Sequence, residues 1–171
     1  MECCPSRLFI LLSSQNKEVV THMMEDARRI MDDSIRAVLP DAAVYRALEG
    51  RRFDRPVTVI AIGKAAWRMA NAAAKALGEN LREGIVITKY GHSEGDIPRM
   101  TIYEAAHPIP DEAGVAATRA ALALADRMTA QDEVIFLVSG GGSALFEQPL
   151  EGVTLDDFAE ITRQLLACGA D

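Results

Sequence analysis

The chain has 171 residues, of which 49% are hydrophobic, so it is long enough for one domain with a full core and is not a disordered segment. It carries 18 Lys and Arg against 25 Asp and Glu, a net charge of −7, which argues against nonspecific nucleic-acid binding and against an anionic membrane as a partner. An anionic substrate would therefore need cations placed locally at its site.

Hydrophobic spacing predicts helices that alternate with strands. Apolar residues at helical spacing over 17–39 predict an amphipathic helix that stops at Pro40, and we interpret its methionines as core filler. A short helix over 41–48 and a polar connection follow. Strands are then expected at 57–62, 84–88, 101–105 and 133–138, and further helices at 64–77, at 111–128 and after Thr154, where residues 154–157 resemble a capping box.

This alternation predicts an α/β fold. Strands that alternate with helices of this length form βαβ units, so we expect a Rossmann-like three-layer sandwich with a mostly parallel sheet covered on both faces. Alanines at 65, 66, 70, 73 and 74 are small enough for a helix to pack closely on the strands. In open α/β sheets, ligands bind outside the carboxyl ends of the strands.

Polar or glycine-rich residues follow each of the four expected strands. If the strands are parallel, these residues converge on one edge of the sheet and form an electropositive crevice suited to an anionic substrate. In chain order they are Lys64 after Gly63, then Lys89 and His92, then His107 and Asp111, and finally Ser139, Gly140, Gly141, Gly142 and Ser143.

The last of these loops is the most informative segment. Residues 133–138 are almost all β-formers and predict a fully buried strand that runs into three glycines. Glycines let backbone N–H groups point together into a nest for a phosphate or carboxylate. An ordinary glycine-rich connection between strand and helix remains the alternative.

Each of the other residues also has a structural alternative. A lysine in the first turn of a helix opposes the helix dipole unless an anion binds there, yet Lys64 could be a solvated surface residue. His92 could be a surface residue, His107 part of a rigid proline turn, and Asp111 only a helix N-cap. The loop carboxylates Glu94 and Asp96 could hold a metal.

Two well-known nucleotide motifs are missing. No G-x-x-x-x-G-K-[ST] loop occurs, and the dinucleotide fingerprint fails because Leu145 stands at its third glycine position and the second strand ends in Lys89, not in an acid. From the residues alone, phosphoryl transfer and nicotinamide-dependent redox chemistry both remain open for an anion-binding α/β domain.

Four motifs together resemble one family. They are Gly-Lys-Ala within 61–70, Lys-Tyr-Gly-His within 86–95, His-Pro-Ile-Pro-Asp within 104–112 and Ser-Gly-Gly-Gly-Ser within 137–145. Their sequence and order resemble the glycerate 2-kinase family, whose second part carries the MOFRL domain and which has an older label, hydroxypyruvate reductase. The resemblance covers about Met24 to Asp171.

The resemblance implies ATP- and Mg²⁺-dependent phosphoryl transfer to the 2-hydroxyl of D-glycerate, giving 2-phosphoglycerate. Lys64 matches the essential lysine of the family, and a cation there would stabilise charge on the phosphoryl group or the glycerate carboxylate. The loop 139–143 would cradle an anion. Lys89, His92, His107 and Asp111 match the remaining motifs and would bind substrate or phosphate, with their individual roles and the metal ligands open.

The resemblance also sets expectations for domain organisation. Residues 1–22 have no counterpart and form an N-terminal extension ahead of Met23 or Met24, while residues 23–171 form a truncated N-terminal domain. Family members are considerably longer, so the C-terminal domain and its catalytic arginine would be missing and this chain alone is expected to be inactive.

Partners and rival functions follow from the same expectation. A homodimer or a missing C-terminal half would complete the protein. The alternatives are a hydroxypyruvate or 2-hydroxy-acid oxidoreductase, and a noncatalytic anion-binding remnant or half of a split enzyme. An exposed apolar sheet edge would favour the last of these. Cys3, Cys4 and Cys168 lack metal-ligand spacing and are interpreted as free thiols of a reducing cytosol.

Overall fold

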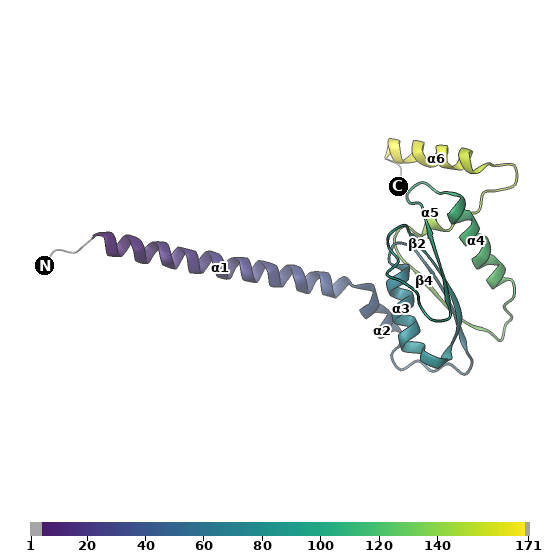
Figure 1. Ribbon diagram of the computed structural model, residues 1–171, viewed down its shortest axis with the longest axis horizontal. Coiled ribbons are helices and arrows are strands. Elements are labelled where there is room, and N and C mark those ends of the chain that lie inside the picture. The colour runs from purple at the N-terminus through teal and green to yellow at the C-terminus, as the bar shows by residue number, and fades with distance from the viewer. Residues whose placement is uncertain (1–4, 170–171) are drawn as a thin grey trace. The chain divides into compact units, whose positions relative to one another are not determined.

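The computed structural model describes residues 5–169, and the chain divides into two units, Met1–Leu39 and Pro40–Asp171. The first unit is one helix, α1 (Pro5–Val38), which begins well before the expected residue 17 (Figure 1). The apolar side chains that the structure describes in it, from Val19 to Val38, are exposed, Met23 at 66% among them. The interpretation of these methionines as core filler is therefore wrong, because within the described part of this unit no second element packs on the helix. Cys3 and Cys4 lie outside the described residues.

The second unit is built on a four-stranded parallel sheet, as expected. Its strands lie in the order β3-β2-β1-β4, and each neighbouring pair runs parallel. The predicted bounds of the first and fourth strands are confirmed, whereas the second begins three residues earlier and includes Lys89. The strands are β1 (Val57–Ile62), β2 (Leu81–Lys89), β3 (Met100–Ala105) and β4 (Glu133–Val138).

Helices cover the two faces of this sheet and make the three-layer sandwich that the alternation predicts (Figure 1). Alternate residues of β1 point to opposite faces. Val57 and Val59 pack with α2 (Pro40–Leu48) and α3 (Ala66–Leu77), whereas Ile60 and Ile62 pack in the cluster that includes α4 (Glu112–Ala125).

Small side chains bring α3 close to the sheet. Ala66, Ala70 and Ala73 are fully buried, and the same helix buries Trp67, whose indole N–H donates to the carbonyl of Gly95 at 2.7 Å. This bond ties the loop after β2 to α3. The small alanine side chains therefore allow α3 to pack closely on the sheet, as the sequence predicts.

Side-chain caps set where two further helices begin. Asp111 accepts the N–H of Gly114 and caps α4, so the N-cap alternative for this residue is correct. Thr154 and Asp157 form the expected capping box of α6 (Leu155–Cys168). Two short elements complete the unit, the 3-10 turn η1 (Gly78–Asn80) and α5 (Gly142–Leu145).

The strand β4 is not fully buried, so that expectation is wrong. Val134, Phe136 and Val138 are 43–56% exposed and alternate with half-buried residues. The reason is position, because β4 is an edge strand and α4 lies over β2 and β3 on that face. An apolar run of this length cannot distinguish a central strand from an edge strand.

Within residues 5–169, no helix has both the length and the apolar character needed to cross a lipid bilayer.

We predict that deletion of residues 1–22 leaves the second unit folded. Its thermal midpoint should move by less than about 2 °C in calorimetry, equivalent to less than about 1 kcal/mol, because the compact unit begins at Pro40. The comparison variant is Leu145→Ala, which empties a fully buried site and should cost about 2–5 kcal/mol. A deletion as damaging as Leu145→Ala would contradict the prediction.

Candidate functional site

The loops after β1 and β4 meet at the carboxyl end of the sheet. The ladder between these strands continues past their ends, since the N–H of Ser139 donates to the carbonyl of Ile62 at 2.9 Å and the N–H of Lys64 donates to the carbonyl of Gly140 at 2.9 Å. The lysine turn and the glycine-rich loop are therefore held together by backbone hydrogen bonds, as expected for parallel neighbours.

The side chain of Ser139 reinforces this junction. Its Oγ accepts the N–H of Ala65 at 3.0 Å and lies 3.3 Å from the carbonyl oxygen of Ile62, to which it donates. Gly63 makes the approach possible, because a Cβ there would lie 2.3 Å from the Ser139 Oγ, and its φ of 112° is one that glycine tolerates. Ser139 thus joins two loops through its side chain.

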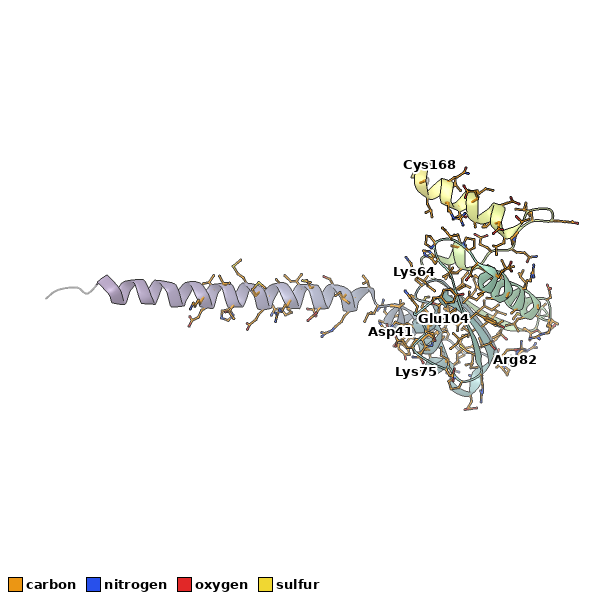
Figure 2. The ribbon with its side chains drawn as sticks, turned by 45° about the horizontal axis from the view of Figure 1, so that its top comes forward. Asp41, Lys64, Lys75, Arg82, Glu104 and Cys168 are labelled. Carbon is orange, nitrogen blue, oxygen red and sulfur yellow. The ribbon has the colours of Figure 1, made fainter. Side chains whose placement is uncertain are left out.

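Lys64 lies in the turn before α3, not in its first helical turn as expected. The helix begins at Ala66 with Ala65 as its N-cap, so Lys64 lies two residues before the first helical residue. Its side chain is exposed, and Figure 2 shows it at the end of the unit opposite to Arg82, near the start of β2. The ammonium group is therefore available at the carboxyl edge.

His107 lies directly against the glycine-rich loop. A Cβ built on Gly141, whose φ is 84°, would lie 2.6 Å from the His107 Nε2 and 3.3 Å from the Lys64 Cε. The glycine therefore lets an imidazole and a lysine stem approach the same backbone segment. Three of the predicted site residues, from three different loops, are brought together here.

The surroundings of His107 favour the neutral form of its imidazole. Partial burial lowers its pKa below 6.5, and the positive charges of Lys64 and Lys89 lower it further. Both lysines are thus close enough to act on the ring. The two lysines therefore supply positive charge beside a ring whose pKa they lower.

His92 joins the same edge through the backbone. Its Nδ1 lies 2.9 Å from the carbonyl oxygen of Lys64, and the N–H groups of His92 and Ser93 both donate to the Glu104 Oε1 at 3.1 Å. Glu104, labelled in Figure 2, thus orders the loop after β2 from the neighbouring strand β3.

The carboxylate of Asp111 is already engaged. Its Oδ1 accepts the N–H of Gly114 at 2.9 Å and its Oδ2 accepts the hydroxyl of Tyr90 at 2.7 Å. Burial raises its pKa, but these hydrogen bonds outweigh burial and hold the pKa below its ordinary value. The bond to Asp111 in turn raises the pKa of Tyr90. Asp111 therefore links two loops and caps a helix.

The part of the chain from 5 to 169 contains no cluster of three or more His, Cys, Asp or Glu side chains suited to a metal. Glu94, considered above with Asp96, pairs with Arg68 at 3.2 Å. The described residues thus fit a phosphate or carboxylate, through lysines and glycine backbone, and do not gather ligands for Mg²⁺.

Sequence reasoning missed three residues of this site. Glu104 orders the His92 loop, Tyr90 bonds to Asp111, and the buried Thr88 donates to the carbonyl of Gly63 at 3.1 Å. A polar residue near the carboxyl end of an apolar strand is the signal that could have found Thr88 and Glu104.

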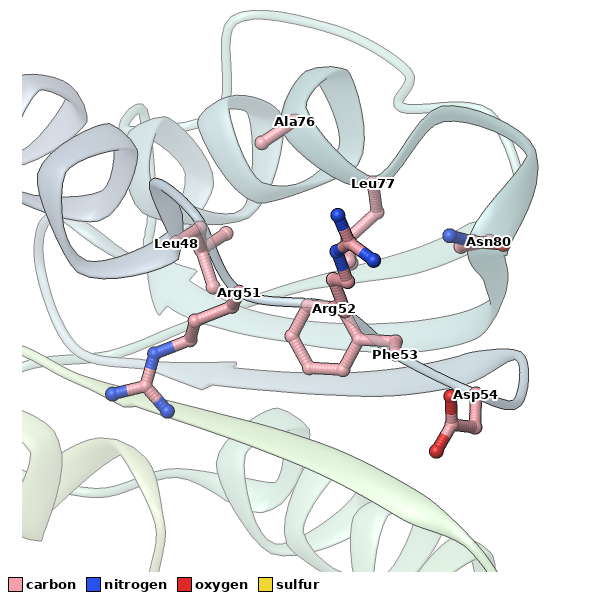
Figure 3. A pocket seen from close by; sticks show the side chains of 8 residues that line it. All are labelled: Leu48, Arg51, Arg52, Phe53, Asp54, Ala76, Leu77 and Asn80. Carbon is pink, nitrogen blue, oxygen red and sulfur yellow. The ribbon is translucent and has the colours of Figure 1, made fainter.

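A separate cavity of about 350 Å³ lies at the opposite end of the sheet, beside the residues that lead into β1. Arg51 and Arg52 contribute its positive charge, and Leu48, Phe53 and Leu77 its apolar wall (Figure 3). None of the predicted site residues lines it, so it is not part of the candidate site.

Known proteins resemble most of this chain. Residues 26–171 match the family model described as "Domain of unknown function (DUF4147)". The D-glycerate 2-kinase of Thermotoga maritima is 53% identical over 144 residues, which are 84% of this chain and 34% of the relative. The chain belongs to the glycerate 2-kinase family. A glycerate 2-kinase from Pyrococcus horikoshii is 37% identical over 163 residues, 89% of this chain and 36% of that one.

Solved structures of the family share the fold. The crystal structure of glycerate kinase from Thermotoga maritima superposes with a TM-score of 0.76 at 51% identity, over 84% of this chain and 34% of that structure. The chain thus spans about a third of the length of the relatives that it matches. The expected family, the α/β fold and the restriction to an N-terminal portion are all confirmed.

We predict that Lys64→Met raises the pKa of His107 part of the way towards 6.5, because one nearby positive charge is lost while burial remains. The measurement is an NMR titration of the imidazole C–H signals, which is simple with three histidines in the chain. Lys75→Met, in the last turn of α3, is the matched control and should leave this pKa unchanged. Equal shifts in both variants would contradict the geometry.

We also predict that Gly141→Ala perturbs the site whereas Gly140→Ala does not. The Cβ at 141 would meet the His107 ring and impose a left-handed backbone on alanine, at about 1–2 kcal/mol from the backbone alone. At Gly140 a Cβ meets nothing within 4 Å. Thermal unfolding and the His107 NMR shift should therefore change only for Gly141→Ala, and similar effects for both variants would count against the described contact.

Proposed function

We propose that this chain is the N-terminal portion of an ATP-dependent glycerate 2-kinase, which phosphorylates D-glycerate to 2-phosphoglycerate. The observation that carries the proposal is the meeting of Lys64, His107 and Gly141 at the carboxyl edge of a parallel sheet. Relatives named as glycerate 2-kinases, at up to 53% identity, support the substrate and the reaction.

In this proposal Lys64 is the main electrostatic group. The 2-hydroxyl oxygen of glycerate forms a bond to the γ-phosphorus of ATP, the bond from that phosphorus to the β-phosphate bridging oxygen breaks so that ADP leaves, and the hydroxyl proton passes to solvent water. Negative charge is spread over the phosphoryl oxygens in the transition state, so a positioned cation stabilises it. The exposed ammonium of Lys64, tied to Gly140 through its backbone, is such a cation.

The glycine-rich loop and the histidines complete the anion site. Backbone N–H groups of Gly140–Ser143 would bind an anionic oxygen, and Lys89 would add a second positive charge. His107 would donate a hydrogen bond to the same anion, and His92 and Asp111 would hold the surrounding loops. The nucleotide brings the phosphates and the family implies Mg²⁺ with it, but no step here depends on a metal ligand from this chain.

The remaining catalytic groups would come from polypeptide corresponding to the rest of the longer relatives. We therefore propose that these 171 residues alone have little or no kinase activity, and that the protein acts in the cytoplasm, where an exposed thiol such as Cys168 stays reduced. A homodimer is the other arrangement that could complete the site.

A chimera tests this function. Residues 26–169 replace the matching third of the Thermotoga kinase, and we predict turnover of D-glycerate with MgATP in the range of about 1–100 s⁻¹. Lys64→Met in the chimera should lower kcat/KM by about 100-fold or more, because a charge aimed at the transition state is lost. Lys75→Met is the matched control and should retain the activity.

Two results would contradict the proposal. A folded chimera without kinase activity would exclude glycerate kinase chemistry for this segment. Oxidation of NADH or NADPH with hydroxypyruvate would instead favour the oxidoreductase. Turnover at an ordinary kinase rate by the 171-residue chain alone would contradict only the statement that it needs more polypeptide.

A further inference from the structure

The tautomer of His92 is fixed by a hydrogen bond to the backbone. Its Nδ1 lies 2.9 Å from the carbonyl oxygen of Lys64. A carbonyl oxygen can only accept a hydrogen bond, so Nδ1 carries the proton. In the neutral imidazole the other nitrogen is then unprotonated, and the Nε2 of His92 has a free lone pair. This hydrogen bond thus selects the tautomer that can accept a proton at Nε2.

The peptide unit that binds His92 belongs to the candidate site. The N–H of Lys64 donates to the carbonyl of Gly140 at 2.9 Å, while the carbonyl of Lys64 accepts the ring of His92. The buried hydroxyl of Thr88 lies 3.4 Å from the same carbonyl oxygen. The imidazole is therefore tied to the backbone that also positions the lysine and the glycine-rich loop.

The loop that carries His92 is ordered by its neighbours. The N–H groups of His92 and Ser93 both donate to the Glu104 Oε1 at 3.1 Å. Further along the loop, the carbonyl of Gly95 accepts the indole N–H of Trp67 at 2.7 Å. The residue His92 is itself exposed on this ordered backbone. Its ring is thus held in position, as proton transfer in a transition state requires, and solvent water can reach it.

The ring of His92 lies near the proposed anion site. Burial has the largest effect on the pKa of His107, followed by the charges of Lys64 and Lys89. A positive charge on His92 lowers the same pKa further, so the two imidazoles are neighbours. Since His107 lies against Gly141, both rings belong to the carboxyl edge of the sheet.

Hydroxyl and aspartate side chains of the site are engaged in the protein's own hydrogen bonds. The carboxylate of Asp111 accepts the N–H of Gly114 on one oxygen and the hydroxyl of Tyr90 on the other. Tyr90 is the donor in that bond, so its oxygen keeps its proton. The Ser139 Oγ accepts the N–H of Ala65 and donates to a backbone carbonyl. These groups hold loops together and are poorly placed to take a substrate proton.

Glu104 and His107 are also less suited to accept a proton than His92. The Oε1 of Glu104 faces the backbone of the loop after β2, where it accepts two N–H groups. Burial lowers the pKa of His107, which makes this ring a weaker base, and its Nε2 lies against Gly141. Among these side chains, His92 alone combines an exposed ring with a tautomer that leaves Nε2 free.

We propose that His92 is a catalytic residue of the kinase, the base whose Nε2 accepts the 2-hydroxyl proton of D-glycerate. This inference rests on the proposed function. As the glycerate oxygen bonds to the γ-phosphorus and ADP leaves, the O–H bond breaks and its proton forms an N–H bond at Nε2. The imidazolium then releases the proton to solvent water, which restores the neutral ring. The hydrogen bond from Nδ1 to the Lys64 carbonyl persists throughout.

Charged groups of this edge act on the step in opposite directions. Positive charge on Lys64, Lys89 or a protonated His107 opposes the imidazolium of His92, whereas the carboxylate of Glu104 on β3 favours it. The neutral ring is the reactive form. The kcat/KM of the active protein should therefore rise with pH through the titration of His92 and then become constant.

The chimera with the Thermotoga kinase tests the catalytic role. His92→Asn keeps an N–H donor near the position of Nδ1 but has no nitrogen that accepts a proton. We expect kcat to fall by about 100-fold and KM to change by less than about threefold, because a positioned base acts on the transition state. Ser93→Ala, in the same loop, keeps the backbone N–H that bonds to Glu104 and should retain the kcat. Circular dichroism checks that each variant is folded.

Two further measurements distinguish a base from a residue that only holds the loop. The rise of kcat/KM with pH should be lost in His92→Asn. Free imidazole added to His92→Ala in the chimera should raise kcat by about tenfold or more, since a small base can replace the missing ring. A residue that only held the loop would be replaced by asparagine with little loss and would not respond to imidazole.

The tautomer is measured on the 171-residue chain itself, without catalysis. Heteronuclear NMR of the imidazole nitrogens, at a pH where the rings are neutral, shows which nitrogen of each ring carries the proton. We expect Nδ1 to carry it in His92, with the signals assigned by their loss in His92→Asn.

The possible results separate this inference from the proposed function. A neutral His92 with its proton on Nε2 would overturn the inference whatever the activity. An active chimera in which His92→Asn keeps its kcat would overturn the inference and leave the proposed function in place. A folded chimera without kinase activity would overturn the proposed function and the catalytic role of His92 together, even with the expected tautomer.

Discussion

The close approach of two loops at the ends of β1 and β4 underlies the site. Parallel strands bring their carboxyl ends to the same edge of the sheet. The close approach of the two loops also requires glycine at position 63, because a Cβ there would lie 2.3 Å from the Ser139 Oγ. The hydroxyl of Ser139 then bonds to Ala65, and the backbone of Lys64 bonds to Gly140. The position of the lysine follows from this junction.

Charge placement explains how an acidic protein presents positive charge at the carboxyl edge of its sheet. The chain carries seven more negative than positive side chains, yet Lys64 and Lys89 lie close enough to His107 to lower its pKa. The acidic residues nearby are engaged, since Glu104 accepts two backbone N–H groups and Asp111 caps α4 and binds Tyr90. Carboxylates thus order the loops while the cations remain available.

The same sheet carries the candidate site at the carboxyl ends of its strands and ends at β4, which pairs with β1 alone among the described strands. Helix α4 covers β2 and β3 but not β4, which leaves Val134, Phe136 and Val138 exposed although their sequence is that of a buried strand. The apolar sequence of β4 and its exposure therefore differ because no helix of the described residues covers this face of the strand.

The sequence by itself determined the class of fold and the composition of the site. Periodicity located β1 and β4 to the residue, because apolar runs between polar breaks are local signals, and strand-end chemistry identified Lys64, His107 and the glycine-rich loop. Only the tertiary structure decided that α1 has exposed methionines, that β4 is an edge strand, and that Glu104 and Ser139 act by ordering neighbouring loops. Those facts depend on which segments distant in sequence become neighbours, and hydrophobic periodicity carries no information about neighbours.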